Sequence, residues 1–131
     1  MGKSRILALL LLFLFGPFAY ASSGEGGESG VEYLPLESLL VNLEGRRHYL
    51  RADIQLLIDS KEHAEKIKMH MPPVRHALIM LFSNRNPEQL SAADEREKLR
   101  QAALEDVTKT LEKYGAGEGL QDLFFTDFLI Q

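Results

Sequence analysis

The most constraining feature of this sequence is the strongly apolar run at residues 123–131, which contains three phenylalanines, two leucines and one isoleucine. Aromatic and β-branched residues favour strands, so we predict a strand pinned inside a sheet, although chain ends usually fray. Simple alternation places apolar residues on both of its faces: Phe124, Phe128 and Ile130 on one, Phe125 and Leu129 on the other. Such a strand is expected to be central or packed against another element. Any face that the helices leave uncovered is the first place to look for a neighbouring subunit.

A second strand is predicted over residues 48–59, where apolar and polar residues alternate. Its expected buried face consists of Leu50, Ala52, Ile54, Leu56 and Ile58. Residues 31–43 are also predicted to be extended, with Pro35 favouring an edge position or a bend. Residues 44–47 form the turn between them. The two segments resemble a hairpin with a long first arm.

Two helices are expected to follow this hairpin. Asp59 is a suitable N-cap for the first, and Glu62 completes a capping-box pattern. The apolar side of this helix consists of Ala64, Ile67 and Met71. The two prolines at residues 72–73 interrupt it, because proline lacks an N–H group and restricts the residue before it. A second helix is predicted over residues 74–83, with Leu78, Leu81 and Phe82 toward the core.

A third, long helix is predicted after a turn at residues 84–87. Ser91 is the expected N-cap, with Asp94 at the reciprocal position. An apolar stripe then recurs at helical spacing through Leu99, Ala103, Val107, Leu111 and Tyr114. The glycines of the segment 115–117 are expected to end the helix.

The predicted order is therefore β-β-α-α-α-β. Helices on one face of a small, mainly antiparallel sheet make an α+β fold. Residues 31–131 are the expected folded domain, and residues 22–30 are a tether rich in glycine and serine. No internal repeat is visible.

Residues 1–21 have the three parts of a secretory signal peptide. A short basic start precedes an unbroken apolar run over residues 6–15, and residues 19–21 form a small-x-small cleavage site. The alternative is a short, uncleaved membrane anchor through residues 6–21, although a spanning helix usually needs about 20 residues. In both cases the remaining chain is expected to be sent across a membrane.

Composition narrows the possible function classes. The chain has 131 residues, a formal net charge of -4 and no cysteine. An acidic chain does not fit nucleic-acid binding, which calls for a basic face. The absence of cysteine excludes disulfides, thiol catalysis and cysteine-ligated metal.

A search for reactive residues assigns no catalytic, cofactor-binding or metal-ligating side chain. His63 and His70 share a helical face, but they lack the additional ligands of a zinc site. There is no Gly-x-Ser-x-Gly elbow and no phosphate-loop spacing. Residues 46–48 are interpreted as a basic turn, and Glu95 and Glu97 as part of a solvated helix face. The sequence therefore predicts a non-enzymatic binding or assembly module without a cofactor. The alternative is an exported module that binds a small ligand, or a metal through His63 and His70.

Several segments, in this order, resemble the FliL family of flagellar basal body-associated proteins. The match begins with Tyr-Leu-Pro-Leu at residues 33–36 and Arg-His-Tyr-Leu-Arg at residues 47–51. It continues with the helix after the prolines, at residues 74–79, and a charged helix start at residues 97–100. It ends with Phe-Thr-Asp-Phe-Leu-Ile-Gln at residues 125–131. They cover nearly all of the predicted domain, and the ordered set is more specific than any one segment.

The resemblance implies a periplasmic domain with a stomatin-like fold. It further implies ring-like homo-oligomers at the flagellar basal body, around stator units of the MotA/MotB type. The implied role is support of stator function, torque and swimming or swarming motility, and no catalytic residue comes with it. The short apolar segment at residues 6–15 departs from the full-length spanning helix of the family, so this chain also fits a soluble or paralogous relative.

Overall fold

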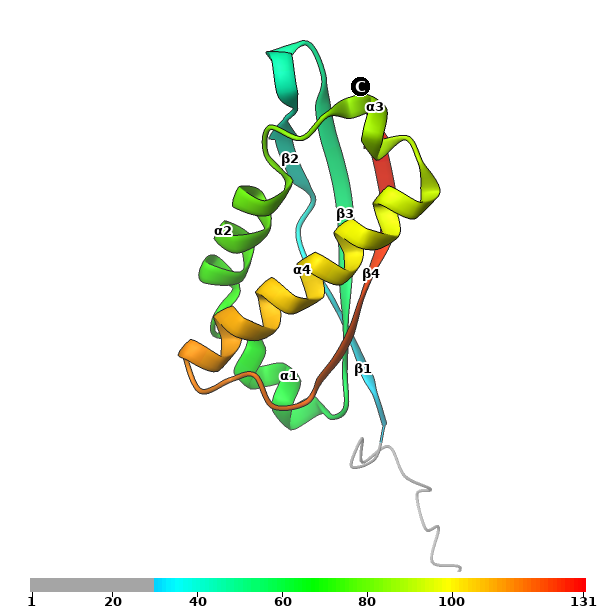
Figure 1. Cartoon of the computed structure of the whole chain (residues 1–131). Coiled ribbons are helices and arrows are strands. Elements are labelled where there is room, and N and C mark those ends of the chain that lie inside the picture. Colours follow the sequence, from blue (N-terminus) through cyan, green and yellow to red (C-terminus); the bar gives the residue numbers. More distant parts are fainter. Residues whose placement is uncertain (1–29) are drawn as a thin grey trace, which may run out of the picture.

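The computed structural model describes residues 30–131. The signal peptide or anchor expected at residues 1–21 lies outside this part of the chain. Residues 22–29 of the expected tether lie outside it as well. The described residues form a sheet and a helical layer packed against one of its faces (Figure 1).

The sheet is antiparallel and is organised around β3 (Tyr49–Ile58). β1 (Glu32–Pro35) and β2 (Leu39–Asn42) lie one after the other along one edge of β3. β4 (Leu120–Ile130) lies along the other edge (Figure 1). The single first arm expected from the sequence is thus two short strands, which separate after Pro35. The turn that follows β2 contains a short 3₁₀ helix, η1 (Glu44–Arg46).

The alternation predicted for β3 is confirmed. Its five expected core residues are all buried, with exposed fractions of 0–1%: Leu50, Ala52, Ile54, Leu56 and Ile58. Because β3 pairs on both edges and is covered on one face, it is the strand around which the core is built.

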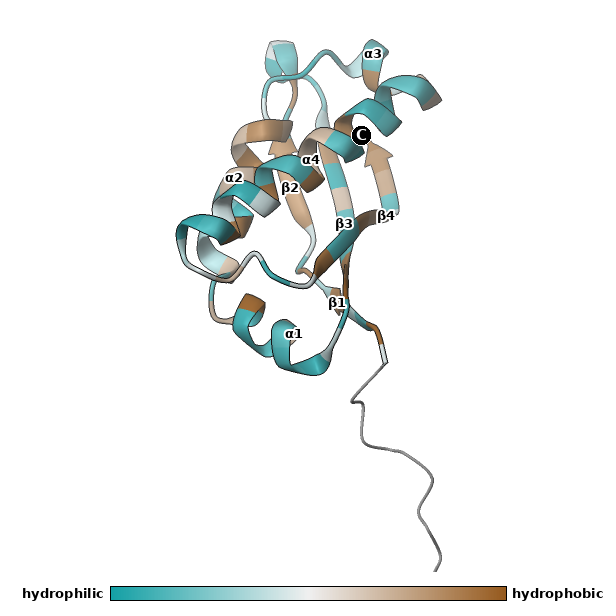
Figure 2. Cartoon of the chain, turned by 60° about the horizontal axis from the view of Figure 1, so that its bottom comes forward, coloured by the Kyte–Doolittle hydropathy of each residue, from teal (hydrophilic) through white to brown (hydrophobic). Residues whose placement is uncertain are grey.

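Four helices cover the inner face of the sheet, where three were expected. They are α1 (Lys61–Lys68), α2 (Met71–Phe82), α3 (Pro87–Leu90) and α4 (Ala93–Lys113). The apolar side of each turns toward the strands, and most of the hydrophilic residues face outward (Figure 2). The small antiparallel sheet with helices on one face confirms the α+β class.

The two N-caps predicted from the sequence are wrong. Ser60, not Asp59, caps α1, and its Oγ accepts a hydrogen bond of 3.2 Å from the backbone N–H of His63. The backbone N–H of Asp59 instead donates to the Gly119 carbonyl at 2.9 Å, which continues the sheet pairing. The turn expected at residues 84–87 leads into α3, capped by Asn86, so that Ser91 ends α3 and does not begin α4.

The apolar stripe of α4 is largely confirmed. Leu99, Ala103, Val107 and Leu111 are buried. Tyr114, its expected last member, is 53% exposed because α4 ends at Lys113. The ring of Tyr114 stacks on that of His70, with 5.1 Å between the ring centroids.

In α2 the two prolines occupy the first turn, where their missing N–H groups have no helical partner to lose.

The final strand is at the edge of the sheet and packs one face against the core, so the second of the two positions expected for it is the one observed. Its predicted faces are right for Phe128, Ile130 and Leu129, but Phe124 and Phe125 are exchanged. Ile54 pairs with Phe125 while Asp53 pairs with Asp127, so Thr126 is an extra residue in a bulge. The bulge puts Phe125 on the same face as Phe128 and Ile130, and all three pack partly against the core. The outer face of β4 carries Phe124 and Leu129, which are 37% and 41% exposed.

Candidate interaction surface

The helices leave the other face of the sheet uncovered (Figure 1). This open face is defined by the side chains that alternate with the buried ones: Tyr33, Pro35, Leu40, Arg51, Asp53, Gln55, Leu57, Phe124, Asp127 and Leu129. Leu40 is 64% exposed and Tyr33 57%, so two of its largest apolar groups are in contact with water. The open face is therefore the candidate site of interaction.

Strand register arranges the open face in rows that run across the sheet. Leu40, Arg51 and Leu129 form one row, because β2 and β4 both pair with β3 at Arg51. Pro35, Gln55 and Phe124 form the next row by the same relation at Gln55. Each row places a polar or charged centre between two apolar flanks. Interaction surfaces often combine apolar anchors with such polar groups.

The charged centre of the open face is slightly acidic. The guanidinium of Arg51 lies 3.7 Å from the carboxylate of Asp53, which also accepts a hydrogen bond from Ser38. Asp127 pairs directly with Asp53 across the strands. Within residues 30–131, Asp127 makes no salt bridge. The arginine thus pairs with only one of the two carboxylates, and this part of the surface favours a partner with positive charge.

The two histidines of the metal hypothesis have other partners. The Nδ1 atom of His63 lies 2.6 Å from a carboxylate oxygen of Asp59, and its Nε2 lies 3.7 Å from Glu118. The bond to Asp59 raises the pKa of His63 and lowers that of Asp59. His70 stacks on Tyr114 at the start of α2. In the described part of the chain, no group of three or more His, Cys, Asp and Glu side chains could hold a metal ion.

The basic turn at residues 46–48 is exposed. Gly45 and Arg46 have φ angles of +79° and +56°, which make the tight turn after β2.

Glu95 and Glu97 lie on the outer side of α4, as expected, and pair with Lys98 and Arg100.

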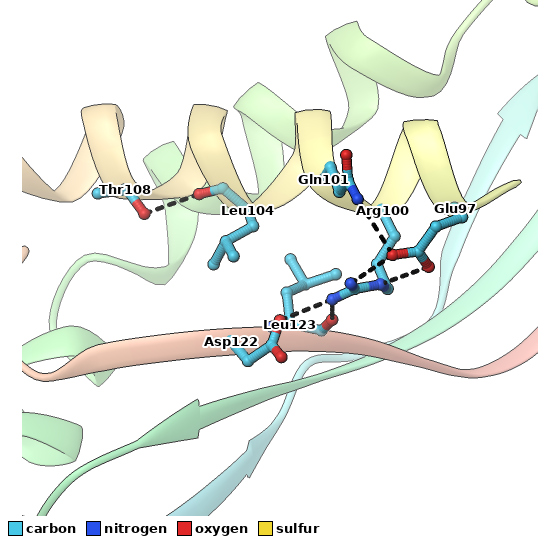
Figure 3. A network of polar contacts seen from close by, with 7 residues as sticks. All are labelled: Glu97, Arg100, Gln101, Leu104, Thr108, Asp122 and Leu123. Atoms are coloured by element: carbon cyan, nitrogen blue, oxygen red, sulfur yellow. Dashed lines mark hydrogen bonds and ion pairs between the residues drawn. The ribbon is translucent and has the colours of Figure 1, made fainter. Parts of the chain in front are cut away.

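Arg100 makes a contact that the sequence did not indicate. It reaches from α4 to β4, where one nitrogen donates to Asp122 at 2.6 Å and to the Leu123 carbonyl at 3.0 Å (Figure 3). Its other nitrogens bind both carboxylate oxygens of Glu97, at 2.9 and 2.6 Å. This pairing lowers the pKa of Glu97 and raises that of Arg100. The network fixes the edge strand to the helical layer and so positions the open face.

Within the part of the chain that the structure describes, no helix is both long and apolar enough to cross a membrane. Among the described residues, the most prominent surface feature is the solvent-exposed, partly apolar open face of the sheet, which suits contact with another macromolecule.

Comparison with known proteins places this fold in a family. The family model of flagellar basal body-associated protein FliL matches residues 33–131. Over 106 residues the chain is 25% identical to Flagellar protein FliL of Aquifex aeolicus (strain VF5), a match that covers 79% of this chain and 63% of that protein. Over 117 residues it is 18% identical to Flagellar protein LafL of Vibrio parahaemolyticus serotype O3:K6 (strain RIMD 2210633), covering 88% of this chain and 70% of that protein. The chain thus spans less than two thirds of the length of the Aquifex protein. The family model matches most of the chain, so the chain belongs to the FliL family of flagellar basal body-associated proteins.

Proposed function

We propose that this protein is a non-enzymatic accessory component of the flagellar motor, which supports stator function, torque and swimming or swarming motility through protein–protein contacts. The observation that carries the proposal is the open face of the sheet, in a chain of the FliL family. Its exposed leucines and aromatic rings are suited to binding a protein surface, and binding needs no reactive side chain.

The proposed location is the periplasm, at the flagellar basal body. The signal-like pattern of residues 1–21 supports export, followed either by cleavage after Ala21 or by anchoring in the inner membrane through residues 6–21. The amino-terminal sequence of the exported protein distinguishes the two: a start at Ser22 means cleavage, and a start at Met1 means anchoring.

The proposed partners are stator proteins of the MotA/MotB type, together with further copies of this chain in a ring-like homo-oligomer. The basal-body association of the family supports motor partners. The slightly acidic centre of the open face further favours a basic patch on whatever binds there.

Deletion of the gene tests the proposed function. Cells without the protein, in a strain that has no second family member, are expected to assemble filaments in normal number. They are expected to swim and swarm more slowly, with the largest deficit in viscous medium, where the motor has to deliver high torque. Normal motility of the deletion strain at every viscosity would contradict the proposal, and so would a loss of the filaments themselves.

A further inference from the structure

The end of β4 leaves one edge of the sheet without a hydrogen-bonding partner. β4 pairs with β3 on one side only, and Figure 1 shows its other side at the margin of the sheet. Gln131 exchanges both backbone hydrogen bonds with Tyr49, at 2.9 and 3.0 Å. In an antiparallel pair, residues bonded in this way alternate with residues whose backbone groups point away from the partner strand. The N–H and C=O groups of Phe128 and Ile130 therefore point away from β3.

These outward groups are free, whereas an earlier part of the same edge is occupied. Within residues 30–131, no hydrogen bond joins the outward N–H and C=O groups of Phe128 and Ile130 to another group. Further back in β4, the N–H of Leu123 donates to Asp122 at 2.8 Å, and its carbonyl accepts from Arg100 at 3.0 Å. The open edge is thus confined to the end of β4, and we define it as residues 127–130.

The sequence of the open edge does not protect it against pairing with another strand. Exposed edges in native sheets are usually protected by lysine, proline, a bulge or a covering helix. The open edge reads Asp-Phe-Leu-Ile and contains neither lysine nor proline. The bulge at Thr126 lies before it, so its pairing with β3 is regular over its whole length. The open edge therefore has the properties of a strand-pairing surface.

Apolar side chains flank the open edge on both faces of the sheet. Phe128 and Ile130 are half-buried on the inner face, and Leu129 is 41% exposed on the outer face. The guanidinium of Arg96 lies 5.6 Å from the centroid of the Phe128 ring, so α4 covers this ring from the helical side. A strand added at the open edge would bury further apolar surface of these side chains, in addition to forming backbone hydrogen bonds.

The open edge also carries an uncompensated negative charge. Asp127 is exposed and makes no salt bridge within the described residues. Its direct neighbour on β3 is another carboxylate, Asp53, which is the one that Arg51 contacts. Opposite charges facing each other across strands are stabilising. A strand on the free side of Asp127 is therefore favoured if it has lysine or arginine at the facing position.

We propose that the open edge binds an extended peptide segment of another protein, which adds one strand to the sheet. The free backbone groups of Phe128 and Ile130 would bond to the peptide backbone, because an extended chain presents donors and acceptors at the matching spacing. The peptide would place apolar side chains on the inner face, beside Phe128 and Ile130. On the outer face it would place a basic side chain beside Asp127.

A second copy of this chain fits the open edge less well than such a peptide. The same stretch of a second copy contains an aspartate and no basic residue. It would therefore bring a further negative charge close to Asp127 and Asp53, and like charges close together across strands are unfavourable. This charge argument favours a segment from a different protein.

The inference goes beyond the proposed function, because it concerns the edge of the sheet and does not require the open face. Peptide binding is measured on purified protein, whereas the role in the motor is measured by motility. Normal motility of the deletion strain contradicts the proposed function alone. Absence of peptide binding at the open edge contradicts the inference alone.

Peptide selection tests the inference. The full chain, purified in the form that the cell produces, is immobilised and used to select from a phage-displayed library of random linear peptides. The selected peptides are expected to alternate apolar residues with lysine or arginine, and a synthetic copy is expected to bind the protein. Selection with an Asp127→Lys variant is expected to yield aspartate or glutamate in place of the basic residues.

Hydrogen exchange then shows where the synthetic peptide binds. The N–H groups of Phe128 and Ile130 are expected to exchange rapidly in the free protein and slowly in the complex. The N–H of Leu129, which points toward β3, is the internal control and is expected to exchange slowly in both. Ile130→Pro removes one outward N–H and is expected to weaken binding about tenfold, whereas Ile130→Val keeps that N–H and is expected to bind like the wild type.

Circular dichroism establishes that the variants are folded, and the exchange experiment on the wild type decides the question if Ile130→Pro does not fold. Three outcomes would overturn the inference. The first is a selection that enriches no peptide over an unrelated acidic protein. The second is a selected peptide that binds without slowing exchange at Phe128 and Ile130. The third is a selected sequence that copies residues 125–130, since the added strand would then be a second copy of this chain.

Discussion

At the scale of single residues, Gly119 fixes how the final strand begins. Its φ angle is +90°, a conformation that residues with a Cβ rarely adopt. A Cβ at this position would lie 2.4 Å from Nδ1 of His63 and 2.6 Å from a carboxylate oxygen of Asp59. Because Gly119 has no side chain, the chain can turn into β4 at this position. His63 and Asp59 can then make their contact directly beside the turn.

Replacement of Gly119 by alanine is expected to destabilise the fold by about 1–3 kcal/mol, because it combines backbone strain with a steric clash. Gly115→Ala is the matched control. Gly115 also has a positive φ, +68°, but open space surrounds it. Gly115→Ala therefore introduces backbone strain without a steric clash. Chemical denaturation of both variants measures the difference. Equal destabilisation by the two substitutions would show that the close approach to His63 contributes nothing.

The His63–Asp59 pair makes stability depend on pH. The bond to Asp59, and to a smaller degree the charges of Glu118 and Glu62, raises the pKa of His63 above its ordinary value of 6.5. The contribution of this histidine is therefore complete below its unfolded pKa and disappears as the pH rises through the raised folded pKa. The pKa of Asp59 is lowered, so its contribution is present above its unfolded pKa and disappears as the pH falls through the lowered folded value.

His63→Gln keeps a hydrogen-bonding side chain but removes the titration. As the pH rises above 6.5, the wild-type melting temperature is expected to fall more steeply than that of the variant, because only the wild type loses a charged partner of Asp59. Thermal melting at a series of pH values measures both slopes. Parallel curves over the whole range would contradict the assignment of this pH dependence to His63.

At the scale of elements, β3 was predictable because its alternation is a local property. Every second residue from Leu50 to Ile58 is apolar, and burial on one face follows from that pattern. The faces of β4 were not predictable in this way. The bulge at Thr126 depends on how β4 pairs with β3, and a run that is apolar at almost every position does not reveal where an extra residue lies.

Helix positions were predictable to within a few residues, while their caps were not. Asp59 and Ser60 are both good N-caps, and the choice between them depends on Asp59 being engaged with Gly119 and His63, which come from other elements. The short α3 was missed because the sequence around Pro87 reads equally well as a turn.

The joint between α4 and β4 depends on Arg100. Replacement of Arg100 by alanine is expected to destabilise the fold by about 2–3 kcal/mol, because Asp122 and the Leu123 carbonyl lose charge-assisted hydrogen bonds. Lys98→Ala, which removes an exposed ion pair with Glu95 on the same helix, is the control and is expected to change stability by less than about 0.5 kcal/mol. Urea denaturation compares the two. Similar small effects would mean that Arg100 is only a surface charge.

At the scale of the whole molecule, the sequence predicted an α+β domain without assigning any reactive residue. It also predicted that an uncovered face of the final strand would be the place to look for a neighbour. The composition of that face could not be predicted, because Leu40, Arg51 and Leu129 come from three strands and meet only through the register of the sheet.

We propose that the protein supports the flagellar motor through the open face. The most direct test replaces the chromosomal gene by a variant that carries Leu40→Asp and Leu129→Asp, two exposed positions in one row of that face. Met69→Asp, at a 76% exposed methionine at the end of α1 and outside that face, serves as the control. In cells with a normal level of the variant protein and normal filaments, swarming is expected to fall to the rate of the deletion strain. Wild-type swarming by cells that contain the folded double variant would contradict it.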